Sequence, residues 1–98
     1  MKIIIVGLGK VGQVLAQALA SENHDLIVID LDKDKVNNVV NYFDVNGICG
    51  NGARSDILTQ ADVQNADILI SVTSEDELNI LVGMVSKRLG VKYVIARV

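Results

Sequence analysis

Gly7-Leu8-Gly9-Lys10-Val11-Gly12 follows directly on the apolar run Ile3–Val6 and opens a helical stretch. The first glycine lets the chain turn sharply out of a strand, the second leaves room for a pyrophosphate, and the third lets the helix pack closely on the strand. Asp30 closes the next apolar run, where an acid accepts hydrogen bonds from adenosine ribose hydroxyls. Strand, glycine turn, helix and acid together predict a dinucleotide-binding unit, whereas the glycines alone would indicate only a tight turn.

Short apolar runs alternate with amphipathic stretches along the whole chain. The runs are rich in Val, Ile and Leu without polar alternation, which is typical of parallel strands covered by helices on both faces. We expect strands at Lys2–Val6, Leu26–Asp30, Val45–Cys49, Ile68–Val72 and Tyr93–Arg97. Alternating βα units with right-handed crossovers predict an α/β fold, a doubly wound, Rossmann-like parallel sheet in the order 3-2-1-4-5.

Apolar residues at spacings of three and four predict a buried stripe on each of three helices. The stripes are Val11, Val14, Leu15, Ala18 and Leu19; Val36, Val39, Val40 and Phe43; and Leu78, Leu81, Val82, Val85 and Leu89. A shorter helix is expected from Ser55 to Ala61 with Ser55 as its N-cap, and Ser74 is the expected N-cap of the last helix. Gly90 suits the C-terminal glycine position of that helix.

Length and charge limit the class of protein. The chain has 98 residues, half of them hydrophobic, and fits one domain over residues 1–98. Its net charge is −3 and its nine Lys and Arg residues form no cluster, which argues against a nucleic-acid or anionic-lipid partner. The longest wholly apolar run, Ile3–Val6, is far below the roughly twenty residues of a membrane span, and the N-terminus lacks the layout of a signal peptide. We therefore expect a cytoplasmic domain.

Two single residues limit the chemistry. Cys49 is the only cysteine and stands in an apolar stretch, so we expect a small core residue. With one cysteine and one histidine, a structural zinc site within the chain is excluded, and we expect no metal. His24 precedes the second strand and is therefore expected at the amino edge of the sheet, opposite a ligand crevice. We expect no catalytic residue and no enzyme activity.

Doubly wound sheets bind ligands at the carboxyl ends of their strands, where the strand order reverses. The pyrophosphate would lie on the glycine loop and on the free N–H groups of the helix that follows it. Asp30 would hold the ribose and repel a 2′-phosphate. Leu31 and Asp32 offer no arginine to take that phosphate, so NAD or NADH is favoured over NADP.

Other strand ends supply further candidates. Gly50-Asn51-Gly52 either leaves room beside the adenine or forms an ordinary loop. Thr73 and Ser74 offer hydroxyls to a phosphate or ribose, and Ser74 serves equally well as a cap. Arg97 is the only arginine near the expected phosphates, and Lys10 either reaches a phosphate or is an ordinary exposed lysine. The candidate cofactor-binding residues are Gly7, Leu8, Gly9, Lys10, Val11, Gly12, Asp30, Gly50, Asn51, Thr73, Ser74 and Arg97.

Several segments resemble the N-terminal domain of the TrkA family, the KTN or RCK-type regulators of potassium transport. The resemblance extends over essentially the whole chain, and the segments that carry it are Met1–Gly9, Asn23–Asp25, Ile29–Asp30, Gly50–Gly52, Val72–Asn79 and Ile95–Val98. The Thr73–Asn79 segment and the closing Ala-Arg-Val are absent from generic dehydrogenase domains. The resemblance implies nucleotide contacts at Gly7 to Val11, Asp30, Thr73, Ser74 and Arg97.

The resemblance also implies a function. It indicates a homo-oligomeric regulator on the inner face of the membrane, partnered with a potassium transporter subunit, in which bound NAD or NADH favours one arrangement of paired domains. An ATP- or ADP-sensing channel regulator is the alternative, because these ligands share the adenosine and phosphates. The cofactor domain of an NAD-dependent oxidoreductase is a third reading, but hydride transfer needs a second domain or long loops. Family members continue past the fifth strand, so we expect this chain to be part of a longer protein. The ligand, membrane partner, oligomer size and direction of the response stay open.

Overall fold

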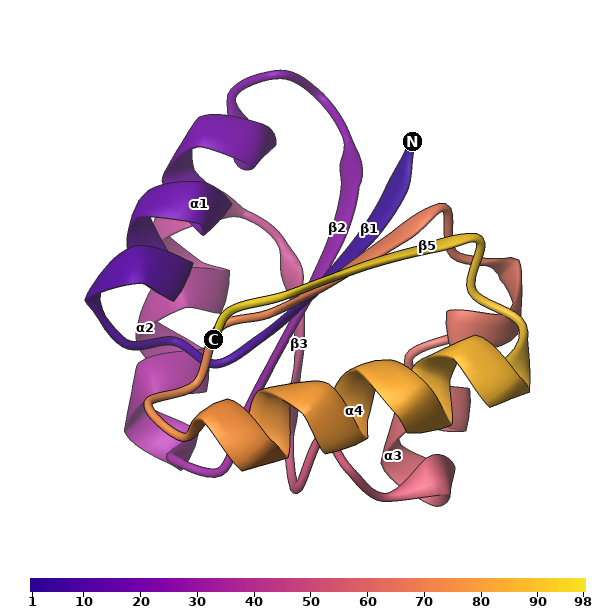
Figure 1. Cartoon of the computed structure of the whole chain (residues 1–98). Coiled ribbons are helices and arrows are strands. Elements are labelled where there is room, and N and C mark those ends of the chain that lie inside the picture. The colour runs from indigo at the N-terminus through magenta and orange to yellow at the C-terminus, as the bar shows by residue number, and fades with distance from the viewer.

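The computed structural model describes all of residues 1–98 as a five-stranded parallel sheet with helices on both faces (Figure 1). The strands are β1 Lys2–Val6, β2 Asp25–Asp30, β3 Asn46–Cys49, β4 Ile68–Ser71 and β5 Tyr93–Ala96. Their order is β3-β2-β1-β4-β5, and every neighbouring pair is parallel. The predicted fold class and strand order are confirmed. The bounds of β2, β3, β4 and β5 differ from the prediction by one residue at one end.

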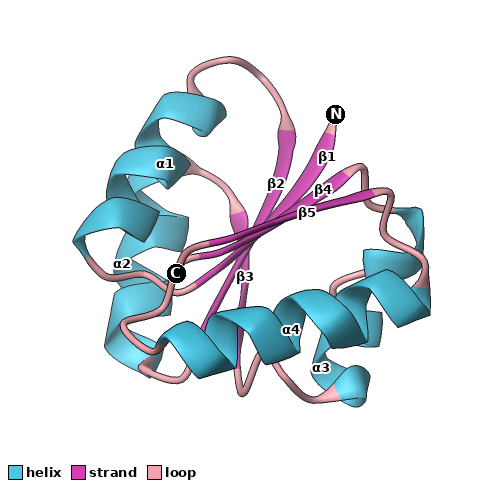
Figure 2. Cartoon of the chain, viewed as in Figure 1, coloured by secondary structure: helices cyan, strands magenta, loops and turns pink.

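The helices divide between the two faces of the sheet (Figure 2). They are α1 Lys10–Ala20, α2 Lys33–Phe43, α3 Ser55–Gln60 and α4 Asp76–Leu89, and a short 3-10 helix, η1, covers Val63–Asn65. The first two pack on one face of the sheet, and the others pack on the opposite face. This division follows from right-handed crossovers that run in opposite directions from the central strand β1.

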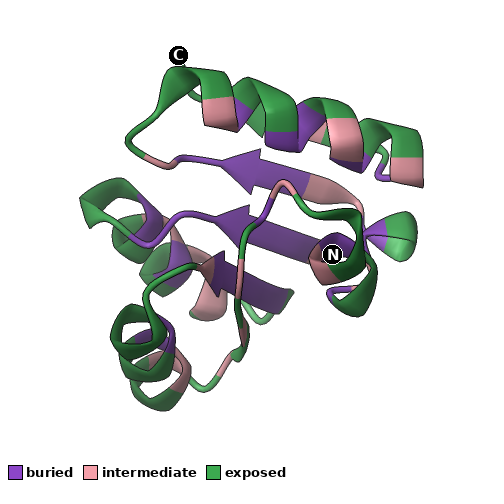
Figure 3. Ribbon diagram, turned by 90° about the horizontal axis from the view of Figure 1, so that it is seen from below, coloured by how far each residue is buried: buried purple, intermediate pink, exposed green.

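Alternate side chains of β1 build two separate cores. Ile3 and Ile5 pack with apolar residues of α1 and α2, whereas Ile4 and Val6 pack with those of α3 and α4. Figure 3 shows the buried residues along the strands and the exposed residues on the outer faces of the helices. Burial on both faces accounts for the unbroken Val/Ile/Leu runs in the sequence.

The buried face of α1 differs from the predicted stripe. Gly12 and Ala16 are buried, whereas Val11 and Val14 are 42% and 61% exposed and Ala18 is also exposed. The helix approaches the sheet through Gly12, whose Cβ, if present, would lie 1.8 Å from the carbonyl oxygen of Gly7. This close approach turns the two valines outward. The stripe of α2 is at least partly buried throughout, as predicted, but Leu81 of α4 is 49% exposed.

Two predicted N-caps are wrong. Arg54 occupies the N-cap position of α3, and Ser55 is the first helical residue. Glu75 occupies that position in α4, because the preceding loop is closed by the hydroxyl of Thr73, which accepts a hydrogen bond from the N–H of Glu75 at 3.2 Å. Gly90 ends α4 with a φ of 117°, as predicted for a C-terminal glycine.

Cys49 is exposed, so the prediction of a core position is wrong. It is the last residue of β3, a short strand at the edge of the sheet, where only one neighbouring strand supplies cover. Its thiol donates a hydrogen bond to the carbonyl oxygen of Leu31 at 3.3 Å. An apolar sequence neighbourhood therefore does not imply burial at the end of an edge strand.

Candidate functional site

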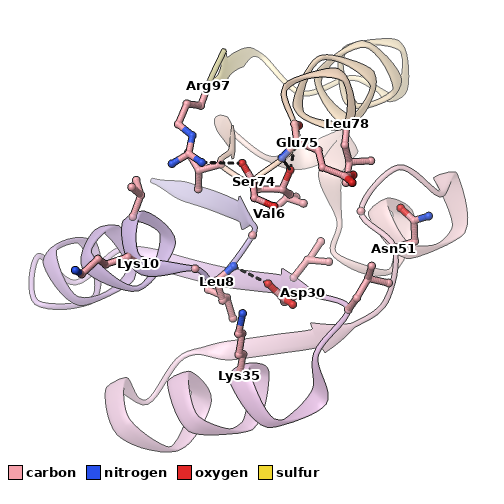
Figure 4. A pocket seen from close by; sticks show the side chains of 18 of the residues that line it. Val6, Leu8, Lys10, Asp30, Lys35, Asn51, Ser74, Glu75, Leu78 and Arg97 are labelled. Atoms are coloured by element: carbon pink, nitrogen blue, oxygen red, sulfur yellow. Dashed lines mark hydrogen bonds between the residues drawn. The ribbon is translucent and has the colours of Figure 1, made fainter.

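A pocket of about 500 Å³ opens at the carboxyl ends of the strands. This volume lies in the range of about 300–1,000 Å³ that is usual for small-molecule sites. The pocket is formed by the loops that follow β1, β2, β3 and β4 and by the residue that follows β5. Its lining residues are Val6, Gly7, Leu8, Gly9, Lys10, Val11, Ile29, Asp30, Leu31, Lys35, Gly50, Asn51, Gly52, Val72, Thr73, Ser74, Glu75, Leu78 and Arg97. Most of their side chains are drawn in Figure 4.

The structure brings together every candidate residue except Gly12, which is buried under the glycine loop. It also adds residues that the sequence reasoning did not select. Most of these are neighbours of candidates along the chain. Lys35 and Leu78 are different, because they reach the pocket from the first turns of α2 and α4. Each is the third residue of a helix that begins just after a strand end, and this position in the first helical turn is the signal that would have found them.

Close contacts at Gly7 and Gly12 shape the glycine loop, whereas Gly9 leaves open space. Gly7 has a φ of 104°, and a Cβ there would lie 2.8 Å from the backbone nitrogen of Thr73. Gly9 differs, because a Cβ at this position would meet no atom within 4 Å. Gly9 is the N-cap of α1, with no side-chain cap and no acid in the first turn of the helix. The N-terminus of α1 therefore presents its backbone donors and its partial positive charge next to the pocket.

Asp30 links the end of β2 to this loop. Its Oδ2 accepts a hydrogen bond from the N–H of Leu8 at 2.7 Å, and its Oδ1 accepts one from the N–H of Asp32 at 2.8 Å. An ionised carboxylate has about four acceptor positions, so two remain for other donors. Asp30 therefore orders two loops while it keeps the capacity to accept hydrogen bonds from hydroxyl groups.

The loop after β4 is held to the end of β5. The guanidinium of Arg97 donates from Nη2 to the carbonyl oxygen of Thr73 at 3.0 Å. The hydroxyl of Thr73 lies 2.7 Å from Oδ1 of Asn79, so it faces the interior of the loop. Ser74 is exposed and lines the pocket. On the other side of the pocket, the side chain of Asn51 accepts a hydrogen bond from the N–H of Ala53 at 2.8 Å and so shapes its own loop.

Positive charge exceeds negative charge in the lining. Lys10, Lys35 and Arg97 face two acids, Asp30 and Glu75. Figure 4 shows the side chain of Lys35 pointing from α2 toward Leu8 and Asp30. None of the three cations takes part in an ion pair with a carboxylate. Such a pocket suits an anionic ligand.

Two of the three lowered carboxyl pKa values occur at the amino ends of the strands, opposite the pocket. The pKa of Asp62 is lowered by hydrogen bonds from the side chains of Lys2 and Asn65. The pKa of Asp67 is lowered by the backbone N–H of Lys2 and by the side chain of Lys92. His24 also lies at this amino edge, as predicted, with Nδ1 3.3 Å from the N-terminal amine. Asp56, in the first turn of α3, also has a lowered pKa, because it bonds to Arg54.

The sheet order, the glycine turn after β1, the acid that ends β2 and the pocket between them define a domain with the Rossmann-like NAD(P)-binding fold. Residues 3–98 match the family model of the TrkA-N domain. The chain belongs to the TrkA-N domain family.

The chain is similar to proteins of potassium uptake systems. It is 44% identical over 98 residues to a Trk system potassium uptake protein TrkA homolog from Archaeoglobus fulgidus, a match that covers 100% of this chain and 22% of the relative. It is 40% identical over 89 residues to a Trk system potassium uptake protein TrkA from Halomonas elongata, covering 91% of this chain and 20% of the relative. The chain thus spans about a fifth of the length of these relatives.

Two solved structures support the fold. The NAD(P)-binding domain of an exopolyphosphatase-related protein from Archaeoglobus fulgidus superposes with a TM-score of 0.84 at 18% identity, covering 98% of this chain and 71% of that one. The Kef CTD of Shewanella denitrificans, solved in an AMP-bound form, superposes with a TM-score of 0.82 at 20% identity, covering 97% and 57%. At these identities the likeness concerns the fold alone. No helix of this chain is both long enough and apolar enough to cross a membrane.

Proposed function

We propose that the chain is a nucleotide-binding regulatory domain of a Trk-type potassium uptake system and that NAD or NADH occupies the pocket. One observation carries the proposal: Asp30 and Gly9 line the same pocket, and the hydrogen bond from the N–H of Leu8 to Asp30 holds their two loops together. The space beside the Cα of Gly9 is free of protein atoms. In this arrangement the carboxylate of Asp30 accepts hydrogen bonds from the ribose hydroxyls. The pyrophosphate lies over Gly9 against the N-terminus of α1, with Arg97 on the far side.

The role proposed for the ligand is to shift a conformational equilibrium. In the parent protein, bound nucleotide would favour one arrangement of paired domains, and a membrane transporter subunit on the inner face of the membrane would respond to it. Couplings of this kind are typically about 1–3 kcal/mol and are limited by the difference in ligand affinity between the two arrangements. Asp76 and Glu77 occupy the first turn of α4 and do not line the pocket, so they take the role of dipole partners.

An adenine nucleotide is the second candidate ligand. Its adenosine and phosphates would meet the same groups at Asp30 and the glycine loop. One observation favours it: the structural neighbour from Shewanella denitrificans was solved with AMP. For ATP or ADP the pocket needs to hold only the adenosine and the phosphates. The nicotinamide half of NAD would have to extend past the glycine loop toward Thr73 and Ser74.

A thermal-shift titration with NAD, NADH, NADP, AMP, ADP and ATP tests the proposal. A ligand at a hundred times its Kd adds about 2.7 kcal/mol, which for a domain of this size raises Tm by roughly 10–20 °C. Stabilisation by NAD or NADH but not by NADP supports the proposed ligand. Stabilisation by the adenine nucleotides alone supports the second candidate, and no shift with any of them contradicts both.

A further inference from the structure

Asn79 is a fully buried amide in the first turn of α4. Its Oδ1 accepts a hydrogen bond from the backbone N–H of Thr73 at 2.8 Å and lies 2.7 Å from the Thr73 hydroxyl and 3.2 Å from that of Ser71. Its Nδ2 donates to the carbonyl oxygens of Thr73 at 3.1 Å and of Arg97 at 3.0 Å. All donors and acceptors of the amide are therefore used inside the protein.

The partners of Asn79 allow only one orientation of the amide. An N–H donor of the backbone lies on one side, and two carbonyl oxygens lie on the other. No carboxylate can replace this amide without a cost, because an ionised carboxylate has no hydrogen to donate to the carbonyls. An apolar side chain would leave the N–H of Thr73 and the carbonyl oxygen of Arg97, both only partly exposed to water, without this partner.

These bonds connect three segments that meet at the pocket. Ser71 ends β4, Thr73 belongs to the loop that follows it, and Arg97 follows β5. Thr73 and Arg97 line the pocket, whereas Asn79 lies beneath them and does not. Thr73 also packs against the glycine loop, because its backbone nitrogen lies 2.8 Å from the position of a Cβ on Gly7. A shift of Thr73 therefore alters both walls of the pocket.

We propose that Asn79 is a positioning residue of the nucleotide site. Its amide holds Thr73 and Arg97 in the arrangement that a nucleotide meets, and it couples ligand affinity to the position of the end of β5. This inference rests on the proposed function, because it assigns a role relative to a bound nucleotide. A displacement of the end of β5 breaks the bond between Asn79 and Arg97, frees the loop that carries Thr73 and weakens binding. By reciprocity, a bound nucleotide favours the position of β5 that keeps this bond.

Asn79→Asp tests the role through its pH dependence. Val82→Ala is the matched control, because Val82 is fully buried on the same helix but packs in the apolar core of the α3 and α4 face. The folded fraction of each variant is first measured at 10 °C between pH 5 and pH 8. NAD, ADP and AMP are then titrated by calorimetry under the same conditions. One oxygen of the introduced carboxyl would face the carbonyl oxygens of Thr73 and Arg97, which disfavours its charged form, and a proton taken up in acid restores the donor that these carbonyls lack.

At pH 8, we expect the affinity of Asn79→Asp for the nucleotide to be at least tenfold lower than that of the unsubstituted chain. At pH 5, the variant should recover most of this lost affinity. Val82→Ala should lower Tm but keep the affinity within about twofold at every pH. An affinity of folded Asn79→Asp equal to that of the unsubstituted chain across the range overturns the proposal. If Asn79→Asp is unfolded at pH 8, Asn79→Ala replaces it. A tenfold loss at all pH values is then expected, and an unchanged affinity overturns the proposal.

A second readout needs no ligand. The N–H of Thr73 donates to Asn79, whereas the N–H of Val72 donates to the backbone oxygen of Val6 at 2.8 Å. In amide exchange measured by NMR, Asn79→Ala, which removes the acceptor Oδ1, should lose protection at Thr73 and keep it at Val72. If the unsubstituted chain binds none of the nucleotides, the proposed function fails, and the coupling to nucleotide affinity fails with it. Protection retained at Thr73 in the variant shows instead that Asn79 does not hold the loop, whatever the chain binds.

Discussion

The carboxylate of Asp30 accepts a hydrogen bond from the backbone N–H of Leu8 at 2.7 Å, and this contact joins the end of β2 to the glycine loop after β1. The residue proposed to hold the ribose therefore also shapes the loop proposed to hold the pyrophosphate. A substitution at Asp30 acts on both halves of the nucleotide. The two effects can be separated, because an amide side chain retains an acceptor for Leu8 while it loses the negative charge.

Asp30→Ala should weaken NAD binding by about 10- to 100-fold, since a hydrogen bond to a charged group contributes about 1.5–3 kcal/mol. Asp30→Asn should lose less affinity for NAD and should bind NADP better than the unsubstituted chain, because the repulsion of a 2′-phosphate disappears. Calorimetric titration measures both. Asp25→Ala, at the amino end of the same strand, is the control and should bind NAD normally. Equal NADP affinities for Asp30→Asn and the unsubstituted chain would contradict the proposed role of the charge.

Gly9→Ala and Gly12→Ala should separate ligand binding from folding. A Cβ on Gly9 meets no protein atom within 4 Å, so this variant should keep its Tm within a few degrees but bind NAD at least tenfold more weakly. A Cβ on Gly12 lies 1.8 Å from the carbonyl oxygen of Gly7, so this variant should lose about 3 kcal/mol of unfolding free energy or more. Urea unfolding and calorimetry measure the two effects. Normal NAD binding by Gly9→Ala would show that the phosphates do not pass over this residue.

The sequence predicts the fold well because the deciding signals are local. Unbroken apolar runs mark the strands, and the spacing from Gly7 to Asp30 marks the crossover that creates the pocket. Burial is less predictable, since it depends on how the elements pack against one another in space. Val11 and Val14 fit a helical stripe but are turned outward by the close contact of Gly12 with Gly7. Cys49 fits an apolar run but ends a strand at the edge of the sheet.

The sequence predicts the lining residues that lie at the ends of the strands, but it does not reveal two that lie on helices, Lys35 and Leu78. Strand ends are found from motifs, whereas Lys35 reaches the pocket only because α2 begins at Lys33 and turns this residue inward. The hydrogen bonds of Thr73 also escape a reading of the sequence. A threonine at a strand end suggests a ligand contact, yet its hydroxyl here lies against Asn79.

Lys35→Ala should weaken binding of every phosphorylated ligand by about three- to tenfold, and NADP more than NAD. The reason is that Lys35 points toward Asp30, where a 2′-phosphate would lie, and has no carboxylate partner. The loss should shrink in high salt, because the contact is electrostatic and exposed. Lys33→Ala, on the same helix but outside the pocket lining, is the control. An unchanged affinity series for Lys35→Ala would mean that this lysine is only a surface residue.

Arg97→Ala should weaken NAD binding by about five- to twentyfold, because it removes both a cation of the pocket and the bond from Nη2 to the oxygen of Thr73. Arg97→Lys should restore only part of the affinity, since an ammonium group does not reproduce the planar fork of a guanidinium. Arg88→Ala is the control, because Arg88 is an exposed arginine in the last turn of α4. Comparable losses for the Arg97 and Arg88 variants would reveal a nonspecific charge effect.

Acid should destabilise the domain through Asp62 and Asp67. Their pKa values in the folded chain are lowered from the ordinary range of an aspartate, so they contribute stability above about pH 4, and this contribution is lost as the pH falls through their folded pKa. Asp67→Asn should therefore lower the unfolding free energy at pH 7 and change it much less at pH 2. Urea unfolding from pH 2 to pH 7 measures this difference. Asp44→Asn is the control, because Asp44 has a φ of 54°, which asparagine also tolerates.

The exposed thiol at the end of β3 has a practical consequence. Cys49 is the only cysteine of the chain and lies against the loop between β2 and α2, directly before the Gly50 and Asn51 that line the pocket. A maleimide fluorophore will therefore attach at one known place, with no cysteine to add or remove elsewhere. The domain carries its own labelling position, from which the arrival of a nucleotide can be followed in real time.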